Sequence, residues 1–186
     1  ESARPSDTWE LSPLMSVPEA IQQYQKNPTI RYIEPDYLYY LDSTTPDDTD
    51  FSDQWGLHND GSSGGTADAD IDAPEAWDKI TNSSVIVAVV DSGIDYTHGD
   101  LNDNIWTNSG ETAGNGVDDD GNGYVDDYYG WDFYDSDNDP MDGYGHGTHV
   151  AGIIGAEGNN GTGVSGVSWS NQLMAVQPDL LWPSLI

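Results

Sequence analysis

Two short stretches of the sequence carry the residue types of a general-base pair. The first is an apolar, mostly β-branched run at residues 85–90, which is followed by the carboxylate of Asp91. Such a run is typical of a fully buried strand, and the chemistry of open α/β sheets gathers at the carboxyl ends of strands. The second is the glycine-rich stretch 145–152, in which His146 stands at the expected start of a packed helix. A carboxylate and a histidine at the ends of rigid elements can form and orient a general base.

The charge balance of the chain excludes several classes of site and partner. The 186 residues include 34 acidic and 4 basic side chains, a net charge of −30, and no cysteine. Residues 42–186 contain 28 of the acids and a single base, Lys79. Such a body does not bind nucleic acid, which needs positive charge, and it must recruit cations, tolerate high salt, or both. Without cysteine, disulfides and cysteine–zinc sites are excluded.

The sequence also indicates where the protein is expected to be located. No apolar run is long enough to span a membrane, and no signal peptide opens the sequence, so we expect no membrane partner. We expect any targeting signal to lie upstream of residue 1. The surplus of acids favours a secreted, salt-adapted protein, and an ordinary acidic extracellular enzyme is the alternative.

The first part of the chain, residues 1–41, has the pattern of a small βαβ piece. Ser16 and Glu19 are spaced as a capping box, and apolar residues follow at helical spacing. A strand is predicted over residues 30–33. Residues 42–70 are rich in Ser, Thr, Asp, Pro and Gly, which is typical of a linker and a surface arm.

The second part of the chain contains the elements that must position the candidate pair. A short helix over residues 72–80, capped by Asp72, is predicted before the first strand. A helix over 146–156 and a strand over 173–176 are predicted further on. Between them, residues 95–145 are acidic, glycine-rich and poor in aliphatic side chains, so we expect a long irregular segment that something else must order.

These stretches resemble the subtilisin-like serine peptidases, or subtilases, over roughly residues 14–176. The similarity is carried by DSGID at 91–95, HGTHVAG at 146–152, QWGLHN at 54–59 and DAPEAW at 72–77, and residues 17–40 resemble the end of the family's inhibitory propeptide. The resemblance implies an α/β fold with a mostly parallel sheet flanked by helices, incomplete here, and preceded by a partial ferredoxin-like propeptide piece.

The resemblance also implies a division of the chain. Residues 1–41 correspond to the C-terminal part of the inhibitory propeptide of a zymogen. Residues 42–186 correspond to the N-terminal part of the catalytic domain. Residues 177–186 are not similar to what normally follows in the family and form an atypical tail.

The implied activity is serine-type endopeptidase cleavage of proteins and peptides, a hydrolase reaction, with the chain's own propeptide as a further partner. Asp91 matches the acid that orients the catalytic histidine, and His146 matches the general base. The family's nucleophile lies in a Gly-Thr-Ser-Met-Ala type of motif, which this chain lacks. Ser165 and Ser168 are poor substitutes, so we expect the chain alone to be inactive. The alternative is a non-catalytic calcium-binding or propeptide-inhibitor fragment.

The spacing of oxygen ligands predicts a first calcium site in the acidic segment. Carboxylates and amides alternate, and glycines permit the turn that gathers them. The site differs from an EF-hand, because Tyr129 stands where the bidentate glutamate would be. A solvated acidic turn is the alternative. The candidate ligands are Asp118, Asp120, Asn122, Tyr124 and Asp127.

Two further groups bring the expected number of Ca²⁺ ions to between one and three. Four closely spaced carboxylates repel strongly without a cation, and they resemble a site that some subtilases have before the histidine helix; they are Asp132, Asp135, Asp137 and Asp139. The last group resembles the family's strong calcium site, which ties the amino-terminal arm to the loop after that helix. Its residues are Asp48, Asp100, Asn160, Thr162 and Val164, and all these hard oxygen ligands favour calcium over softer metals.

Two other patterns carry less weight. Residues 161–166 match G-x-G-x-x-G, but a helix rather than a strand is expected before them, so a dinucleotide site is rejected. His146 and His149 have the spacing of metal ligands, but no glutamate follows His146 as in H-E-x-x-H, which disfavours zinc. An incomplete sheet would expose an edge and apolar surface, so we expect poor solubility.

Overall fold

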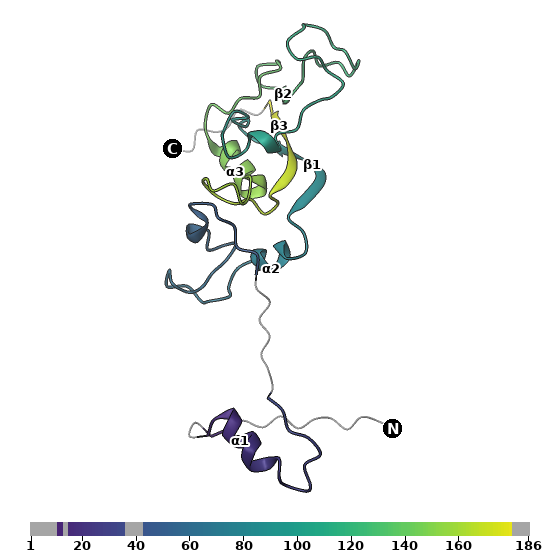
Figure 1. Cartoon of the computed structure of the whole chain (residues 1–186). Coiled ribbons are helices and arrows are strands. Elements are labelled where there is room, and N and C mark those ends of the chain that lie inside the picture. Colours follow the sequence, from purple (N-terminus) through teal and green to yellow (C-terminus); the bar gives the residue numbers. More distant parts are fainter. Residues whose placement is uncertain (1–10, 13–14, 36–42, 180–186) are drawn as a thin grey trace. The chain divides into compact units, whose positions relative to one another are not determined.

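The computed structural model describes residues 11–12, 15–35 and 43–179. The chain divides into two units, Glu1–Asp42 and Ser43–Ile186, which are described separately (Figure 1). Within the described residues, no helix is both long and apolar enough to cross a bilayer.

The first unit contains one helix, α1 (Val17–Tyr24). Its start follows the predicted capping pattern, because the Glu19 carboxylate accepts hydrogen bonds from the backbone N–H and the hydroxyl of Ser16, at 2.9 and 2.8 Å. The strand predicted over residues 30–33 is wrong, since these residues form no strand. A strand needs a neighbour to pair its backbone groups, and the described part of this unit offers none. The described residues therefore do not form the predicted βαβ piece.

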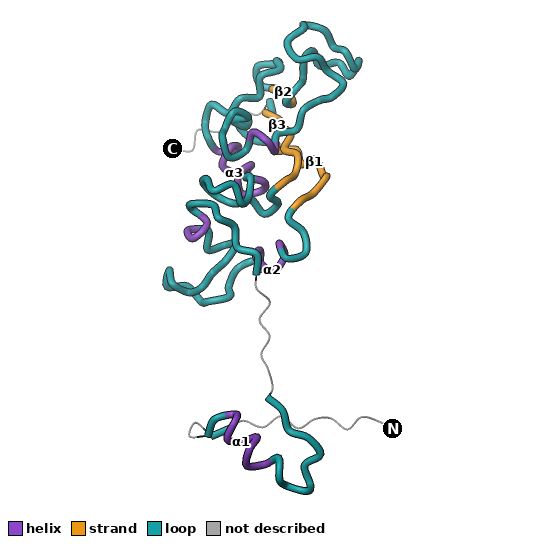
Figure 2. Tube along the Cα trace, viewed as in Figure 1, coloured by secondary structure: helices purple, strands orange, loops and turns teal. Residues whose placement is uncertain are grey.

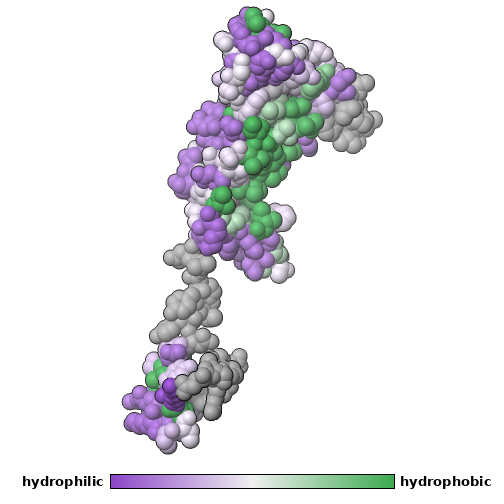
Figure 3. Space-filling view, turned by 90° about the vertical axis from the view of Figure 1, so that its right-hand side faces the viewer, coloured by the Kyte–Doolittle hydropathy of each residue, from purple (hydrophilic) through white to green (hydrophobic). Residues whose placement is uncertain are grey.

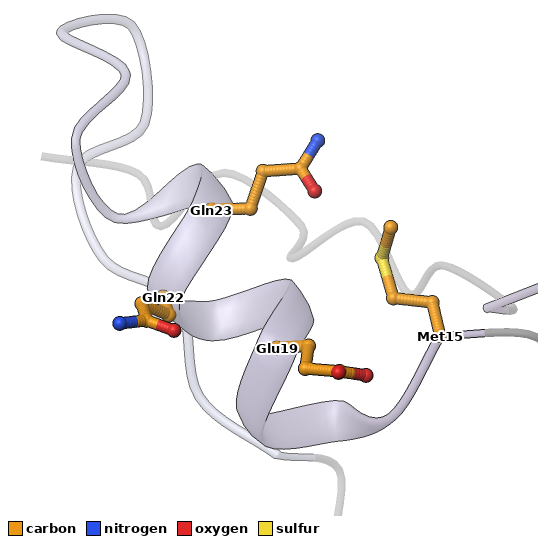
Figure 4. Close-up of a pocket in the computed structure, with 4 residues that line it drawn as sticks. All are labelled: Met15, Glu19, Gln22 and Gln23. Carbon is orange, nitrogen blue, oxygen red and sulfur yellow. The ribbon is translucent and has the colours of Figure 1, made fainter.

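A shallow hollow lies along α1. Figure 4 shows Met15, Glu19 and Gln23 extending to one side of the helix, and Gln22 completes the lining. The only carboxylate in this lining is the one already bonded to Ser16, so the hollow offers no catalytic group.

The second unit is built on a parallel three-stranded sheet with the order β1-β3-β2 (Figure 2). The strands are β1 (Asn82–Val90), β2 (Gly130–Asp132) and β3 (Ser170–Gln177). The predicted α/β fold with a parallel sheet is confirmed. β2 was not predicted, because three residues are too few to show a periodic pattern. Gln177, the first residue of the predicted atypical tail, is the last residue of β3, and residues 180–186 lie outside the described residues.

The main core lies between this sheet and α3 (His146–Gly155), which ends one residue before its predicted end. Alternate side chains of the strands point to the helix, so Val89, Leu173 and Ala175 are buried with Ala151. The same cluster includes buried residues from the loop after β1, which are Ile94, Leu101 and Ile105.

β1 is not the fully buried strand that its apolar sequence predicts. Val85 and Val90 are 61 % and 62 % exposed, Ile86 is 46 % exposed, and only Val89 is buried. The reason is topological: β1 is an edge strand that pairs with β3 alone. Figure 3 shows a continuous band of hydrophobic surface on this unit. The predicted open edge and apolar surface are therefore present, and the poor solubility that should follow stays a prediction.

A second, smaller cluster lies around α2 (Ala73–Trp77). The Trp77 ring lies 5.8 Å from Phe51 of η1 (Phe51–Asp53) and 4.9 Å from Trp169. Two predictions for this helix are wrong. It ends at Trp77 rather than residue 80, and Asp72 does not cap it through its side chain. The backbone of Asp72 is left-handed, with φ at 54°, so the residue lacks the extended conformation from which a capping side chain normally reaches back.

The acidic segment 95–145 is irregular, as predicted. It contains only the short turn η2 (Asn102–Asn104) and β2 as regular elements. Its backbone is instead held by side-chain carboxylates that accept hydrogen bonds from backbone N–H groups.

Candidate active site

The structure brings the two predicted catalytic side chains into contact. Asp91 immediately follows β1, and His146 is the first residue of α3. His146 Nδ1 lies 2.7 Å from Asp91 Oδ1. The backbone N–H of Asp91 donates to Val176 O at 3.0 Å, which ties the carboxylate to the carboxyl end of β3.

Glycine makes this close approach possible. A Cβ on Gly147 would collide with the carbonyl oxygen of Gly93 and lie 3.1 Å from the Asp91 Cβ. Gly93 itself has φ at +100°, and a Cβ there would lie 2.6 Å from Pro140 O. The loop after β1 therefore needs glycine at Gly147 to pack against α3, and at Gly93 to pack against the loop that precedes α3.

The electrostatics favour an ionised acid beside a proton-carrying imidazole. Burial acts to raise the pKa of Asp91, but hydrogen bonds from His146 and from the Ser92 backbone outweigh it and hold the pKa below the ordinary 3.8. A carboxylate only accepts, so Nδ1 of His146 carries the proton and Nε2 is left as the basic nitrogen. The His146 side chain is 50 % exposed, so a nucleophile could approach it from outside.

Of the two serines considered as substitute nucleophiles, one donates its hydroxyl to a carboxylate and the other has no base beside it. Ser165 is fully buried, and its hydroxyl donates to Asp48. The hydroxyl of Ser168 is buried and has no hydrogen-bond partner. Neither arrangement is that of an activated nucleophile.

The first acidic group is only partly assembled as predicted. Asp120 and Asp127 lie close together, with ligand atoms within 4.8 Å of each other and of Glu111. The side-chain amide of Asn122 donates to both aspartates, at 3.2 and 3.0 Å. Asp118 instead accepts backbone N–H groups of its own turn, among them that of Gly123 at 2.9 Å. Tyr124 packs its ring 4.8 Å from that of Trp131.

Glu111 is a member of this cluster that the sequence analysis missed. It is buried and lies nine residues before Asp120. Its Oε1 accepts from the backbone of Asp119 and Asp120, and its Oε2 accepts from Asp126. Sequence spacing alone offers no signal for such a contact, because the intervening loop determines it.

The four carboxylates of the second group are not gathered at one point. Asp132 is buried and caps the turn that follows it, through the backbone N–H groups of Tyr134 and Asp135. Asp137 accepts the backbone N–H of Asp139. Asp139 accepts a hydrogen bond from the Tyr96 hydroxyl at 2.7 Å. Burial is the larger cause and this hydrogen bond the next that raise the pKa of Tyr96, so the hydroxyl stays protonated.

The third group is brought together around Asn160. Its backbone N–H donates to Asp48 and its side-chain amide donates to Asp100, both at 2.9 Å. The backbone of Val164 donates to Asp100 at 3.0 Å, and that of Thr162 donates to Asn160 Oδ1 at 2.8 Å. These bonds join the amino-terminal arm to the loop after α3.

The three acidic groups differ in whether their ligands could meet at one ion. Within the described residues, Glu111, Asp120 and Asp127 are the one set of three histidine or carboxylate ligands that could hold an ion together. Neither His146 nor His149 belongs to this set. The sequence analysis also missed three residues around the candidate pair, namely Ser92, Asp142 and Thr148.

The comparisons with known proteins agree on one family. Residues 82–183 match the family described as Peptidase_S8, the Subtilase family. The thermophilic serine proteinase of Bacillus sp. (strain AK1) is 34 % identical over 164 residues, which are 87 % of this chain and 32 % of that protein. Subtilisin-like protease 1 of Plasmodium berghei (strain Anka) is 48 % identical over 104 residues, which are 54 % of this chain and 17 % of that protein.

A solved structure supports the fold. The crystal structure of the Aeromonas sobria serine protease in complex with its chaperone matches with a TM-score of 0.53 and 25 % identity, over 76 % of this chain and 21 % of that one. The chain spans about a third or less of the length of these relatives.

Proposed function

Because the chain belongs to the subtilase family of serine peptidases, we propose that His146 and Asp91 are the general base and the orienting acid of an endopeptidase site. The observation that carries the proposal is the 2.7 Å contact between His146 Nδ1 and Asp91 Oδ1 at the ends of α3 and β1. Substrates would be proteins and peptides.

The chemistry assigned to the pair is proton transfer. Asp91 holds the imidazole with its proton on Nδ1, so that Nε2 can take the proton of a serine hydroxyl as that oxygen attacks the peptide carbonyl. The imidazolium formed in this step lies beside the carboxylate, which stabilises its charge. His146 then returns the proton to the leaving amine.

We propose that this chain alone does not complete the reaction. No Gly-Thr-Ser-Met-Ala type of motif occurs in the 186 residues, and Ser165 donates its hydroxyl to Asp48. The proposed roles of residues 1–41 as an inhibitory propeptide and of 42–186 as part of a secreted catalytic domain rest on the resemblance. The alternative, a non-catalytic calcium-binding or inhibitory fragment, is favoured by the same missing motif.

Three measurements on the full chain test the site and its alternative. In ¹⁵N-histidine NMR, the Nδ1 proton of His146 should give a downfield signal that Asp91→Asn weakens, whereas Asp103→Asn, the same charge change at an exposed residue, should not affect it. Incubation with casein and a serine-directed fluorophosphonate should give no cleavage and no label. Labelling of Ser165 or Ser168 would overturn the assignment of a missing nucleophile. Inhibition of thermitase by the chain would favour the inhibitory fragment.

We also propose that Glu111, Asp120 and Asp127 hold a Ca²⁺ ion. The donor set fits, because three carboxylates whose oxygens lie within 4.8 Å repel one another and offer only hard ligands. When bound, the ion would neutralise this charge and stabilise the folded loop. The second proposed site is the group of Asp48, Asp100 and Asn160. The contacts give least support to the group between Asp132 and Asp139.

Calorimetric titration with Ca²⁺ tests these sites. We expect at least one ion per chain, and Glu111→Gln should remove one binding event while Asp103→Asn removes none. Fewer than one ion bound to the unaltered chain would contradict all three sites.

A further inference from the structure

One half-buried carboxylate outside the candidate pair, that of Asp142, contacts both of the motifs that supply the pair. Asp142 lies four residues before His146, in the loop that leads into α3. Its Oδ1 accepts from the Ser92 hydroxyl at 3.0 Å and from the backbone N–H groups of Tyr144 and Gly145, both at 2.8 Å. Its Oδ2 accepts the backbone N–H and the hydroxyl of Thr148, at 2.9 and 2.7 Å.

The two hydroxyl groups form bridges between the β1 loop and α3. Ser92 Oγ also accepts the buried backbone N–H of Gly147 at 3.0 Å, and Thr148 Oγ1 accepts the backbone N–H of Asp95 at 2.9 Å. A hydroxyl has one proton to donate. Because each of these protons goes to Asp142, the oxygen lone pairs are turned toward the two N–H groups. The carboxylate therefore sets the direction of both bridges.

These bridges attach at the neighbours of the candidate pair. Ser92 follows Asp91, and Gly147 follows His146, so the Gly147–Ser92 bond joins the two residues next to the acid and the base. The loop of Asp142 is fixed on the same side by the backbone, since Ile94 N–H donates to Pro140 O at 3.0 Å. A shift of this loop would move both ends of the pair.

The charge of Asp142 is retained in this environment. Burial acts to raise its pKa, but the hydrogen bonds from Thr148, Gly145 and Tyr144 outweigh it and hold the pKa below the ordinary 3.8. A negative charge at the start of the ten-residue α3 also matches the positive end of the helix dipole.

We propose that Asp142 is the positioning residue of the site, which holds His146 at hydrogen-bonding distance from Asp91 through the Ser92 and Thr148 hydroxyls. The inference rests on the proposed function of that pair. Asp142 contacts neither reacting group, so its role is to fix their geometry, and a displacement of a catalytic group by about 1 Å can cost about a hundredfold in rate.

The main test is Asp142→Asn in the full chain. The amide has the same shape, but its NH₂ group cannot accept from a hydroxyl, so at least one hydroxyl loses the acceptor that orients its bridge. We expect the His146 Nδ1 proton signal to be lost to exchange with water. The Gly147 amide should exchange at least about tenfold faster, which corresponds to about 1.4 kcal/mol for a lost hydrogen bond. Asp103→Asn should leave both readouts unchanged.

A second variant covers the case in which Asp142→Asn fails to fold. Thr148→Val keeps the side-chain shape and removes only the second bridge, and slow exchange at the Leu173 and Ala175 amides of β3 reports an intact sheet. With the sheet intact, loss of the Nδ1 signal in either variant supports the proposal. If the signal is retained in both, the positioning role is overturned.

Failure of the positioning role of Asp142 can be told apart from failure of the catalytic pair. If the unaltered chain shows no downfield Nδ1 signal, or if Asp91→Asn leaves it in place, the catalytic pair itself fails. If Asp91→Asn removes the signal and the Asp142 and Thr148 variants do not, only the positioning role fails.

Discussion

The candidate active site and the acidic loop of residues 108–127 both contain buried carboxylates, but they stabilise them differently. The buried Asp91 and the half-buried Asp142 lie near the ends of β1 and α3, and each has an imidazole or hydroxyl partner. Glu111 is surrounded by loop, and its recorded partners are backbone N–H groups. Other carboxylates lie within 4.8 Å of Glu111. Secondary structure therefore preorganises the first region, whereas the second concentrates like charge, which is the reason for the cation proposed there.

The largest effect should come from breaking the packing of the first region. Gly147→Ala places a Cβ against the Gly93 carbonyl, so α3 must move away from Asp91. We expect a loss of about 3 kcal/mol in the free energy of unfolding, measured by urea denaturation.

The matched control lies in the same helix. Gly152 has no atom within 4 Å of an added Cβ, so Gly152→Ala should stabilise the protein by up to about 1 kcal/mol through helix propensity. Equal effects of the two substitutions would contradict the close approach at Gly147.

Calcium removal should affect the second region and spare the first. An ion present at a hundred times its Kd contributes about 2.7 kcal/mol. After addition of EDTA, the amides of Asp119, Asp120 and Asp126 should exchange faster with deuterium, because Glu111 loses the charge that holds it in place. The Gly147 amide should keep its rate. Unchanged exchange in the loop would argue against a bound cation.

Acid should weaken the first region through its two carboxylates. The pKa values of Asp91 and Asp142 are both lowered in the folded chain, so their contribution is fully present above about pH 5 and is lost as the pH falls below 3.8 through the folded values. The free energy of unfolding, measured across this range, should therefore fall less steeply for Asp142→Asn than for the unaltered chain. Parallel curves would contradict the assigned direction of the pKa shift.

The smallest effect concerns a contact that lies outside the acidic loop. Tyr96→Phe removes the hydroxyl that donates to Asp139 but keeps the ring that stacks on Tyr129 at 4.2 Å. We expect a loss of about 1 kcal/mol in thermal unfolding. Tyr96→Ala, which also removes the stacked ring, should cost clearly more.

Local chemistry explains what could be predicted. Three predicted features depend only on neighbours along the chain, and the structure has all of them. They are the Ser16–Glu19 cap, the start of α3 at His146 and the strand that precedes Asp91. The strand over residues 30–33, the side-chain cap at Asp72 and the burial of β1 were wrong. Each of these depends on a partner element or on a backbone angle that residue types do not specify.

The candidate sites also divide into residues that local motifs reveal and residues that depend on distant partners. Asp91 and His146 could be found because each lies in a motif whose residue types are demanded by its own turn, including the glycines that allow the close approach. Asp142 and Glu111 could not, since they have partners far along the chain, such as Ser92 for Asp142 and Asp126 for Glu111.

The amino-acid sequence by itself determined the parallel α/β class, the family and the two candidate catalytic side chains, because periodicity and short motifs encode local geometry. Only the tertiary structure decided that β1 lies at an open edge, that Asp142 joins both motifs, and that Glu111 rather than Asp118 completes the acidic cluster. Those outcomes depend on which distant segments meet, and a carboxylate in the sequence does not specify whether an N–H group, a hydroxyl or another carboxylate will face it.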